Sequence, residues 1–213
     1  PFPTPTLMTL APAAERRFDM TLEELNLTCD RLEAAQACRN LVGKLSYFDS
    51  AFRTNDFIAL WADTENAALE LDGVSLKGFP AVKEYLKKKG DRNDPGMDIA
   101  MRGTLVIHNM NCDALTVAPD AKTAHGTWFS PGIATDLFDP KNPTAIPDKH
   151  NTAELDASAN YIWQEYALDF LHTDAGWRIQ SLKVRTFFDT PFDTPWSESV
   201  NTMWGRDQII AEM

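Results

Sequence analysis

Apolar residues in the first quarter of the chain recur at helical spacing. These residues follow one another at steps of three or four, with one wider gap: Leu32, Ala35, Leu41, Leu45, Phe48 and Phe52. This spacing puts apolar side chains on one face of a helix, so it predicts a long amphipathic helix over residues 28–53. Just upstream, Thr21 and Glu24 have the spacing of a capping box, in which two side chains satisfy backbone N–H groups at a helix start.

A short second helix and a β-hairpin are predicted next. Asn55 can cap the helix, because its side-chain oxygen can accept a hydrogen bond from a first-turn N–H. Residues 67–71 and 74–76 are strand-like segments on either side of Asp72-Gly73, a dipeptide that favours a tight hairpin turn. The chain therefore turns back on itself soon after the second helix.

A third helix is predicted between Pro80 and Gly90, because proline suits the first turn of a helix and glycine its end. Lys87, Lys88 and Lys89 are the nearest thing to a basic run in the chain. At a helix C-terminus their charges complement the helix dipole. We therefore interpret this run as a helix end and not as a binding site.

The second half of the chain is strand-like. Five strands are predicted: Thr104–Asn109, Asp113–Val117, Thr123–Phe129, Ala159–His172 and Gly176–Phe188. Turn residues separate several of them. The segment 136–157, rich in Pro, Asp and Asn, is predicted to be a long loop beside the sheet. Helices followed by strands that hairpins connect indicate an α+β fold with an antiparallel sheet.

Composition and charge limit the classes of molecule that the protein can bind. The chain has 213 residues, 44% of them hydrophobic, and a formal net charge of -11. Such an acidic field opposes nucleic acid and anionic membranes, because binding their phosphates needs clustered Lys and Arg. No apolar run approaches the roughly 18–20 residues that span a bilayer, and residues 1–17 lack a signal-peptide pattern. Three cysteines without disulfide spacing, Cys29, Cys38 and Cys112, are expected to be reduced thiols in a cytoplasmic protein.

Several segments together resemble nuclear-transport-factor-2-like, or SnoaL-like, proteins. Residues 41–61 (LVGKLSYFDSAFRTNDFIALW) and 78–85 (GFPAVKEY) resemble the opening helices of that family. Residues 122–128 (KTAHGTW) resemble its middle strand. Residues 166–170 (YALDF), followed by 174–179 (DAGWRI), resemble its closing hairpin. The resemblance implies a strongly curved sheet wrapped by the N-terminal helices, forming a cone with an internal pocket.

The resemblance covers residues 25–195, which we expect to form one domain between an N-terminal arm (1–24) and a C-terminal tail (196–213). Family members include polyketide cyclases, steroid isomerases, scytalone-type dehydratases, bile-acid 7-alpha-dehydratases and lignin-diarylpropane γ-formaldehyde lyases, so fold alone does not choose an activity. Curved sheets of this family often leave their convex face apolar. Because Leu182 and Val184 alternate onto one face, the resemblance implies a homodimer or homotrimer.

His108 is the first candidate catalytic residue. It shares a strand face with Val106 at the end of an apolar segment. An ordinary pKa near 6.5 allows a histidine to act as base or acid near neutral pH. A hydrogen-bonded structural histidine is the alternative. Bile-acid dehydratases carry a catalytic histidine at the matching place, so the resemblance implies a catalytic role.

Arg185 is the second candidate. The same dehydratases have an arginine in a Val-Arg step of their final strand, which Val184-Arg185 reproduces. A guanidinium there could hold an oxyanion or a departing hydroxyl, while a salt bridge across the sheet is the alternative. Lys183 alternates onto the same face and is expected to contact the substrate.

Tyr47 and Asp49 are further catalytic candidates on opposite flanks of the long helix. The family often carries a Tyr and, a few residues later, an Asp on this helix. Tyr47 matches approximately, but the Asp position falls near residues 51–53. This departure weakens the expectation of a His–Asp dyad.

The remaining candidates would bind substrate. The aromatic residues suit a flat ligand, although core packing is the alternative for each, and an Asn can equally serve a turn. These candidates are Asn111, Trp128, Tyr161, Trp163 and Tyr166.

We expect no metal and no cofactor. His125, His150 and His172 share no ligand spacing with His108, and the chain has no HExxH motif. It also has no GxGxxG, phosphate-binding loop or GxSxG, so nucleotide and serine-hydrolase functions have no support.

The sequence and the resemblance favour a cofactor-independent lyase acting on a hydroxylated aromatic or polycyclic molecule. Loss of water could give an alkene, or it could pass through a quinone methide and release formaldehyde, as in lyases that act on lignin-derived diarylpropanes. Isomerisation or cyclisation by proton abstraction next to a carbonyl is an alternative. So are a non-catalytic module that only binds a small molecule and a protein-interaction scaffold.

Overall fold

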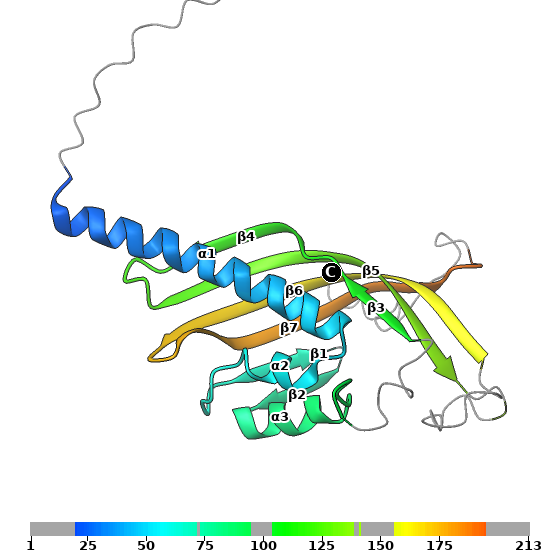
Figure 1. Ribbon diagram of the computed structural model, residues 1–213. Coiled ribbons are helices and arrows are strands. Elements are labelled where there is room, and N and C mark those ends of the chain that lie inside the picture. Colours follow the sequence, from blue (N-terminus) through cyan, green and yellow to red (C-terminus); the bar gives the residue numbers. More distant parts are fainter. Residues whose placement is uncertain (1–19, 72, 95–103, 139–140, 142–155, 195–213) are drawn as a thin grey trace, which may run out of the picture.

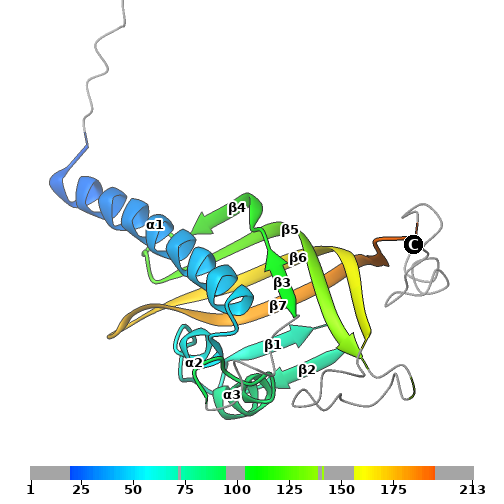
Figure 2. The ribbon, with the colours of Figure 1, turned by 45° about the vertical axis from the view of Figure 1, so that its right-hand side comes forward.

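Three helices lie on the same side of a curved sheet in the computed structural model (Figures 1 and 2). The structure describes residues 20–71, 73–94, 104–138, 141 and 156–194. In chain order the elements are α1 (Leu22–Ser50), α2 (Thr54–Ile58), β1 (Ala68–Leu71), β2 (Val74–Lys77), α3 (Phe79–Lys87), β3 (Leu105–His108), β4 (Asn111–Val117), β5 (Thr123–Phe138), β6 (Asp156–Thr173) and β7 (Gly176–Pro191). The α+β class and the N-terminal position of the helices agree with the prediction.

The sheet is mixed, with the strand order β2-β1-β7-β6-β5-β3 and with β4 also paired to β5. The prediction of an antiparallel sheet is correct for every pair except β1 and β7, which are parallel. A hairpin makes two consecutive strands antiparallel, but about half of the chain separates β1 from β7. Their relative direction is therefore set by the fold and not by a turn.

Strand β5 is much longer than the sequence indicates. It pairs with β6 without interruption from Thr123↔Leu171 to Phe138↔Asp156. The prediction of a loop over residues 136–157 is therefore wrong at both ends, because backbone pairing continues through polar residues. Residues 139–140 and 142–155 lie outside the described residues. The length of β5 allows β4 and β3 to pair with successive parts of it.

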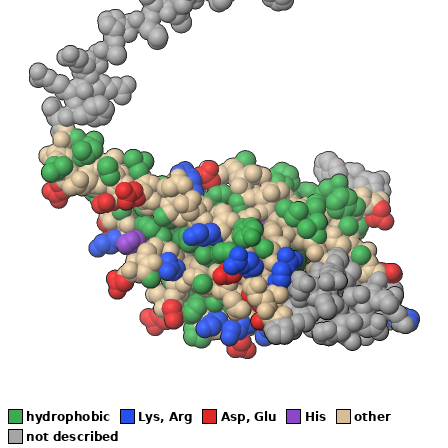
Figure 3. Space-filling model, in the orientation of Figure 1, with side chains coloured by type: hydrophobic (Ala, Val, Ile, Leu, Met, Phe, Trp, Pro, Cys, Tyr) green, Lys and Arg blue, Asp and Glu red, His purple; other side chains and the backbone are tan. Residues whose placement is uncertain are grey.

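Helix α1 starts at the predicted capping box. The Thr21 backbone N–H donates to Glu24 at 2.7 Å, and the Glu24 N–H donates to the Thr21 hydroxyl at 3.2 Å. The helix begins earlier than the predicted residue 28 and ends at Ser50, before Phe52 adopts a φ of 55°. Its first turns project past the sheet and carry exposed leucines (Figure 3), so burial periodicity could not reveal them.

The short elements follow their local signals with one exception. Gly73 turns the β1–β2 hairpin with a φ of 93°, and α3 has proline in its first turn. Asn55, however, does not cap α2, because it lies inside the helix. The side chain of Asp91 serves this end instead, accepting a hydrogen bond from the Asn55 N–H at 2.7 Å.

The core lies between the helices and the face of the sheet that they cover, which we call the inner face. Fully buried side chains of this layer include Leu45 and Cys38 on α1 and Leu168, Phe170 and Ile179 on the sheet. Burial raises the pKa of the Cys38 thiol to about 12, whereas Cys29 and Cys112 are exposed and all three are free thiols. Within the described residues, no helix is long and apolar enough to cross a membrane.

Candidate active site

A cavity of about 220 Å³ lies between the helices and the inner face. Most of its wall is apolar and comes from α1, α2, α3 and five of the strands. Polar side chains enter it from two sides. On the helix side are Asp49, Lys89 and Tyr85, and on the strands are His108, Gln164 and Tyr166.

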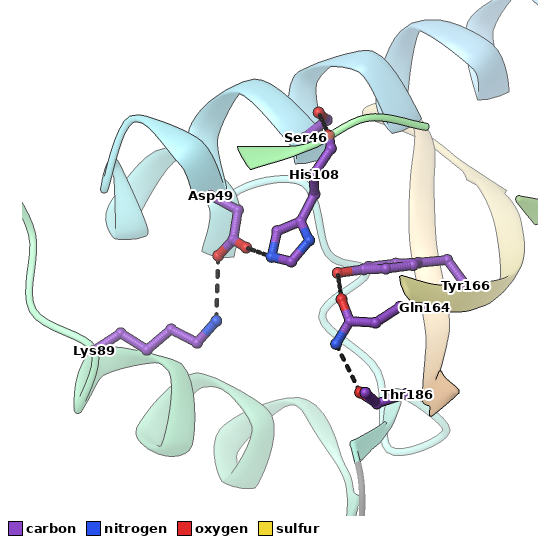
Figure 4. Close-up of polar contacts among 7 residues, drawn as sticks. All are labelled: Ser46, Asp49, Lys89, His108, Gln164, Tyr166 and Thr186. Carbon is purple, nitrogen blue, oxygen red and sulfur yellow. Dashed lines mark hydrogen bonds and ion pairs between the residues drawn. The ribbon is translucent and has the colours of Figure 1, made fainter. Parts of the chain in front are cut away.

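His108 stands at the centre of the polar wall (Figure 4). It ends the short strand β3, where it pairs with Gly132 of β5, and only 8% of it is exposed. The Ser46 hydroxyl of α1 donates a hydrogen bond to the His108 backbone carbonyl. One turn further along α1, Asp49 Oδ2 lies 3.5 Å from His108 Nε2. One helix turn therefore holds both the backbone and the ring of this residue.

The two ring nitrogens of His108 have different surroundings. Asp49 faces Nε2 and favours the tautomer that carries its proton there. The buried Nδ1 has no hydrogen-bond partner among the residues that the structure describes. Its side of the ring faces Tyr166, whose ring centroid is 5.8 Å from that of His108 (Figure 4). In this tautomer Nδ1 carries the basic lone pair.

Burial lowers the pKa of His108 below its usual value. The negative charge of Asp49 acts in the opposite direction, and the positive charge of Lys89 adds to the lowering. A buried imidazole with this net effect is neutral at neutral pH. It can therefore accept a proton, as a general base must.

Lys89 is a member of the site that the sequence did not reveal. It lies two residues past the end of α3, and its Nζ is 3.2 Å from Asp49 Oδ1. The Asp49 carboxylate thus lies between the Lys89 ammonium and the His108 ring (Figure 4). Explaining the lysine run by the helix dipole alone is incomplete, because Lys89 lines the cavity.

Gln164 and Tyr166 form a second polar wall, of which only Tyr166 was predicted from the sequence. The Tyr166 hydroxyl donates to Gln164 Oε1 at 3.1 Å, and Gln164 Nε2 donates to the Thr186 hydroxyl at 2.9 Å (Figure 4). All three are buried. Tyr166 was a predicted substrate-binding residue and lines the cavity, whereas a single Gln or Thr on a strand carries no signal in the sequence.

Arg185 does not join His108. In β7, Leu182 and Val184 are buried and line the cavity, so the intervening Lys183 and Arg185 lie on the outer face and are exposed. Lys183 forms an ion pair there with Glu70 at 2.7 Å. The expectation that Leu182 and Val184 make a convex association surface is wrong for the same reason.

Five further candidates lie away from the cavity. Tyr47 is 59% exposed on α1, and Asn111 is exposed at the start of β4. Trp128 faces inward but packs in the core, edge-on to Phe170. Because Ile162, Gln164 and Tyr166 of β6 face inward, the alternate residues Tyr161 and Trp163 lie on the outer face.

A second His–Asp pair shows why distance alone does not identify the site. His125 Nδ1 lies 2.7 Å from Asp169 Oδ1, closer than His108 to Asp49. These two side chains are 60% and 54% exposed on the outer face, where water screens their charges. His108 differs because it is buried beside a cavity.

Metal ligands do not gather anywhere in the described part of the chain. Within it, no group of three or more His, Cys, Asp or Glu side chains could hold a metal ion. The polar groups of the cavity are one carboxylate, one ammonium, one imidazole, one amide and two phenols. This set can accept and donate protons, and it can stabilise negative charge on oxygen.

The sequence of residues 30–183 matches the SnoaL-like domain, so the chain belongs to that family. A comparison with curated proteins finds no match. Similar solved structures include a candidate scytalone dehydratase from Novosphingobium aromaticivorans, with 14% identity, a TM-score of 0.54, and coverage of 79% of this chain and 93% of the other.

Two dehydrochlorinases are similar to the same degree. The hexachlorocyclohexane dehydrochlorinase LinA-type3 from Novosphingobium barchaimii has 16% identity and a TM-score of 0.52, covering 79% of this chain and 96% of its own. LinA has 14% identity and a TM-score of 0.54, with the same coverage. At such identities these structures establish the NTF2-like fold and nothing further.

Proposed function

We propose that this protein is a cofactor-independent lyase that removes water from a small hydroxylated aromatic or cyclic molecule. One observation carries the proposal: a buried imidazole lines a mostly apolar cavity, Asp49 lies beside its Nε2, and its Nδ1 has no hydrogen-bond partner among the described residues. This arrangement suits removal of a proton from a bound molecule.

The reaction proceeds as an elimination. His108 Nδ1 takes a proton from carbon, the electrons of that C–H bond form the new double bond, and the C–O bond of the neighbouring carbon breaks. The leaving hydroxide takes the proton back from the imidazolium and departs as water, which returns His108 to its neutral form. Asp49 stabilises the imidazolium between these steps and keeps the ring in one tautomer.

Gln164 supplies a hydrogen-bond donor for the substrate, and Tyr166 orients its amide. The Gln164 amide uses its oxygen for Tyr166 and one N–H for Thr186, and it has a second N–H to donate. That N–H can donate to a carbonyl or phenolic oxygen that gains negative charge as the C–H bond breaks, while the Tyr166 hydroxyl, which donates to Gln164, fixes the orientation of the amide. Donors in a dry site are effective because they need no reorganisation.

The size of the cavity limits the substrate. Pockets for drug-sized ligands have roughly 300–1,000 Å³, whereas this one has about 220 Å³. We therefore propose a substrate with one or two rings and not the polycyclic molecule that the sequence left open. The similar solved structures include a candidate dehydratase and two dehydrochlorinases. Their names denote loss of water or of a small acid, which supports an elimination reaction for this protein.

Loss of formaldehyde is the second candidate reaction, favoured by the second amide N–H of Gln164, which can donate to a phenolic oxygen in the cavity. A para-phenol that loses water becomes a quinone methide. A base then removes the proton of a neighbouring hydroxymethyl group, formaldehyde leaves, and the electrons restore the phenol ring. A lignin-derived diarylpropane would give a stilbene, water and formaldehyde by this route.

Turnover of a substrate panel by chelator-treated protein tests the proposal. The panel contains phenolic diols, including diarylpropanes, and cyclic β-hydroxy ketones. Ultraviolet absorbance reports new conjugation, a separate assay reports formaldehyde, and mass spectrometry detects isomers of unchanged mass. Because general base catalysis contributes typically 10²–10⁴-fold, His108→Gln is expected to lower kcat by about that factor.

His125→Gln is the matched control, since it removes the histidine of the exposed His–Asp pair and should leave turnover unchanged. Conjugation with no formaldehyde identifies a dehydratase, and both signals together identify the deformylating lyase. Products of unchanged mass would mean that the protein is an isomerase and not a lyase. Full turnover by His108→Gln would overturn the proposal, and binding of panel members without any turnover would make the protein a binding module.

A further inference from the structure

We propose that Lys89 is a positioning residue of this site, acting on His108 through Asp49. Its ammonium keeps His108 uncharged before the reaction and gives the site a net positive charge once His108 holds the proton. This inference rests on the proposed role of His108 as the base.

Asp49 lies between the Lys89 ammonium and the His108 ring, which becomes a cation when it takes a proton. Its Oδ1 lies 3.2 Å from Lys89 Nζ, and its Oδ2 lies 3.5 Å from His108 Nε2. The Asp49 side chain is only 19% exposed, so water screens these interactions less than at an open surface. Lys89 itself is 44% exposed at the edge of the cavity, which allows its charge to remain hydrated.

Counting the charges shows what Lys89 adds. Before the reaction Asp49 and Lys89 cancel and His108 is neutral, so the polar wall has no net charge. After proton transfer the imidazolium makes the wall positive by one unit, which matches the negative charge that develops on the substrate. Without Lys89, the same wall would be negative before transfer and neutral after it.

The elements packed around His108 offer little else that is charged. The groups facing it are Ser46 and Asp49 from α1, Gly132 from β5 and Tyr166 from β6, with Lys89 behind Asp49. Among the described residues, only Asp49 and Lys89 act on the charge of His108. The effect of Lys89 opposes that of Asp49 and adds to that of burial, so Lys89 helps to set how readily His108 takes a proton.

The test measures the titration of the His108 ring C–H signals by NMR, which needs no substrate. Lys89→Met is compared with Lys89→Arg, which keeps the charge, and with Lys88→Met, which removes an exposed neighbouring charge outside the cavity. We expect the pKa of His108 to rise in Lys89→Met, and to stay near that of the unchanged protein in the two controls. If the pKa of His108 is the same in Lys89→Met as in the unchanged protein, the inference is overturned.

Turnover separates this inference from the proposed function. For Lys89→Met we expect the acid limb of the kcat/KM profile to move to higher pH and kcat to fall about tenfold, equivalent to ~1.4 kcal/mol, with rescue by Lys89→Arg. If His108→Gln is inactive while Lys89→Met has an unchanged profile, only the inference fails. If His108→Gln keeps full turnover, the proposed function fails, whatever the His108 titration shows.

Discussion

His108 combines burial with an unsatisfied nitrogen. Leaving a buried polar atom without a hydrogen bond costs about 1–3 kcal/mol, and Nδ1 lacks such a bond within the part of the chain that the structure describes. A purely structural histidine would usually satisfy both nitrogens. The exposed His125, which needs no such arrangement, is the contrasting case on the opposite face.

The same burial predicts that the protein loses stability in mild acid. Because the pKa of folded His108 lies below that of an unfolded chain, the unfolded state binds more protons as the pH falls below about 6.5. This contribution to the free energy of unfolding is complete above that pH and is lost as the pH falls through the folded pKa. Urea unfolding between pH 7.5 and pH 5 measures it.

The variant His108→Gln supplies the comparison. It should show a weaker dependence of the free energy of unfolding on pH over this range, because glutamine does not titrate. An equal dependence in both proteins would mean that His108 is not held neutral by the fold.

Helix α1 and strand β5 hold the polar wall around His108 in place. Ser46 and Asp49 stand three residues apart on α1, so both reach His108 from one face of the helix. From the other side, β3 pairs with β5 at Gly132, where an added Cβ would lie 2.2 Å from the Ile107 backbone oxygen and 3.6 Å from His108 Nδ1. Only glycine allows this approach of the two strands.

Gly132→Ala is therefore expected to lower the free energy of unfolding by about 1–3 kcal/mol, the usual cost of overpacking, and to displace His108. Thermal or urea unfolding measures the first effect and turnover the second. Gly43→Ala is the control: Gly43 is exposed within α1 with nothing near its Cβ position, so alanine should stabilise the helix by about 0.5–1 kcal/mol. Equal stability of the two variants would contradict this account of the β3–β5 contact.

At the scale of the whole molecule, the outer face carries an aromatic patch, which we define by Phe129, Tyr161, Trp163 and Phe187. Their exposed fractions lie between 39% and 47%. The Phe129 ring of β5 lies against those of Trp163 on β6 and Phe187 on β7, while Tyr161 stacks on Phe192. Exposed apolar patches of this kind mark interaction surfaces. The association expected from the family thus has a different candidate surface from Leu182 and Val184.

We predict that the chain associates with copies of itself through the aromatic patch. Trp163→Asp should reduce the mass measured by light scattering at micromolar concentration to that of one chain, because a buried unpaired charge is unfavourable. Leu32→Asp, which alters the exposed leucines of α1 instead, should leave the mass unchanged. A single-chain mass for the unchanged protein would contradict the prediction, and sensitivity only to Leu32→Asp would move the interface to α1.

Local signals determined much of this protein by themselves. The capping box at Thr21, the turn at Gly73 and the period of two in the later segments predicted the element order and the α+β class, because these depend on neighbouring residues only. The position of His108 at the end of a strand, on the same face as Val106, also followed from local alternation. Element ends were less predictable, as β5 shows, because strand pairing extends through residues with no strand signal.

Tertiary structure alone decided which residues meet. Alternation states that Val184 and Arg185 face opposite sides, but only the position of the helices determines which side is covered, and it buries Val184. The contact of His108 with Asp49, and of Asp49 with Lys89, joins segments tens of residues apart through the packing of α1 against β3 and the turn after α3. Such distances are set by how the elements pack in three dimensions, and no periodicity along the chain records them.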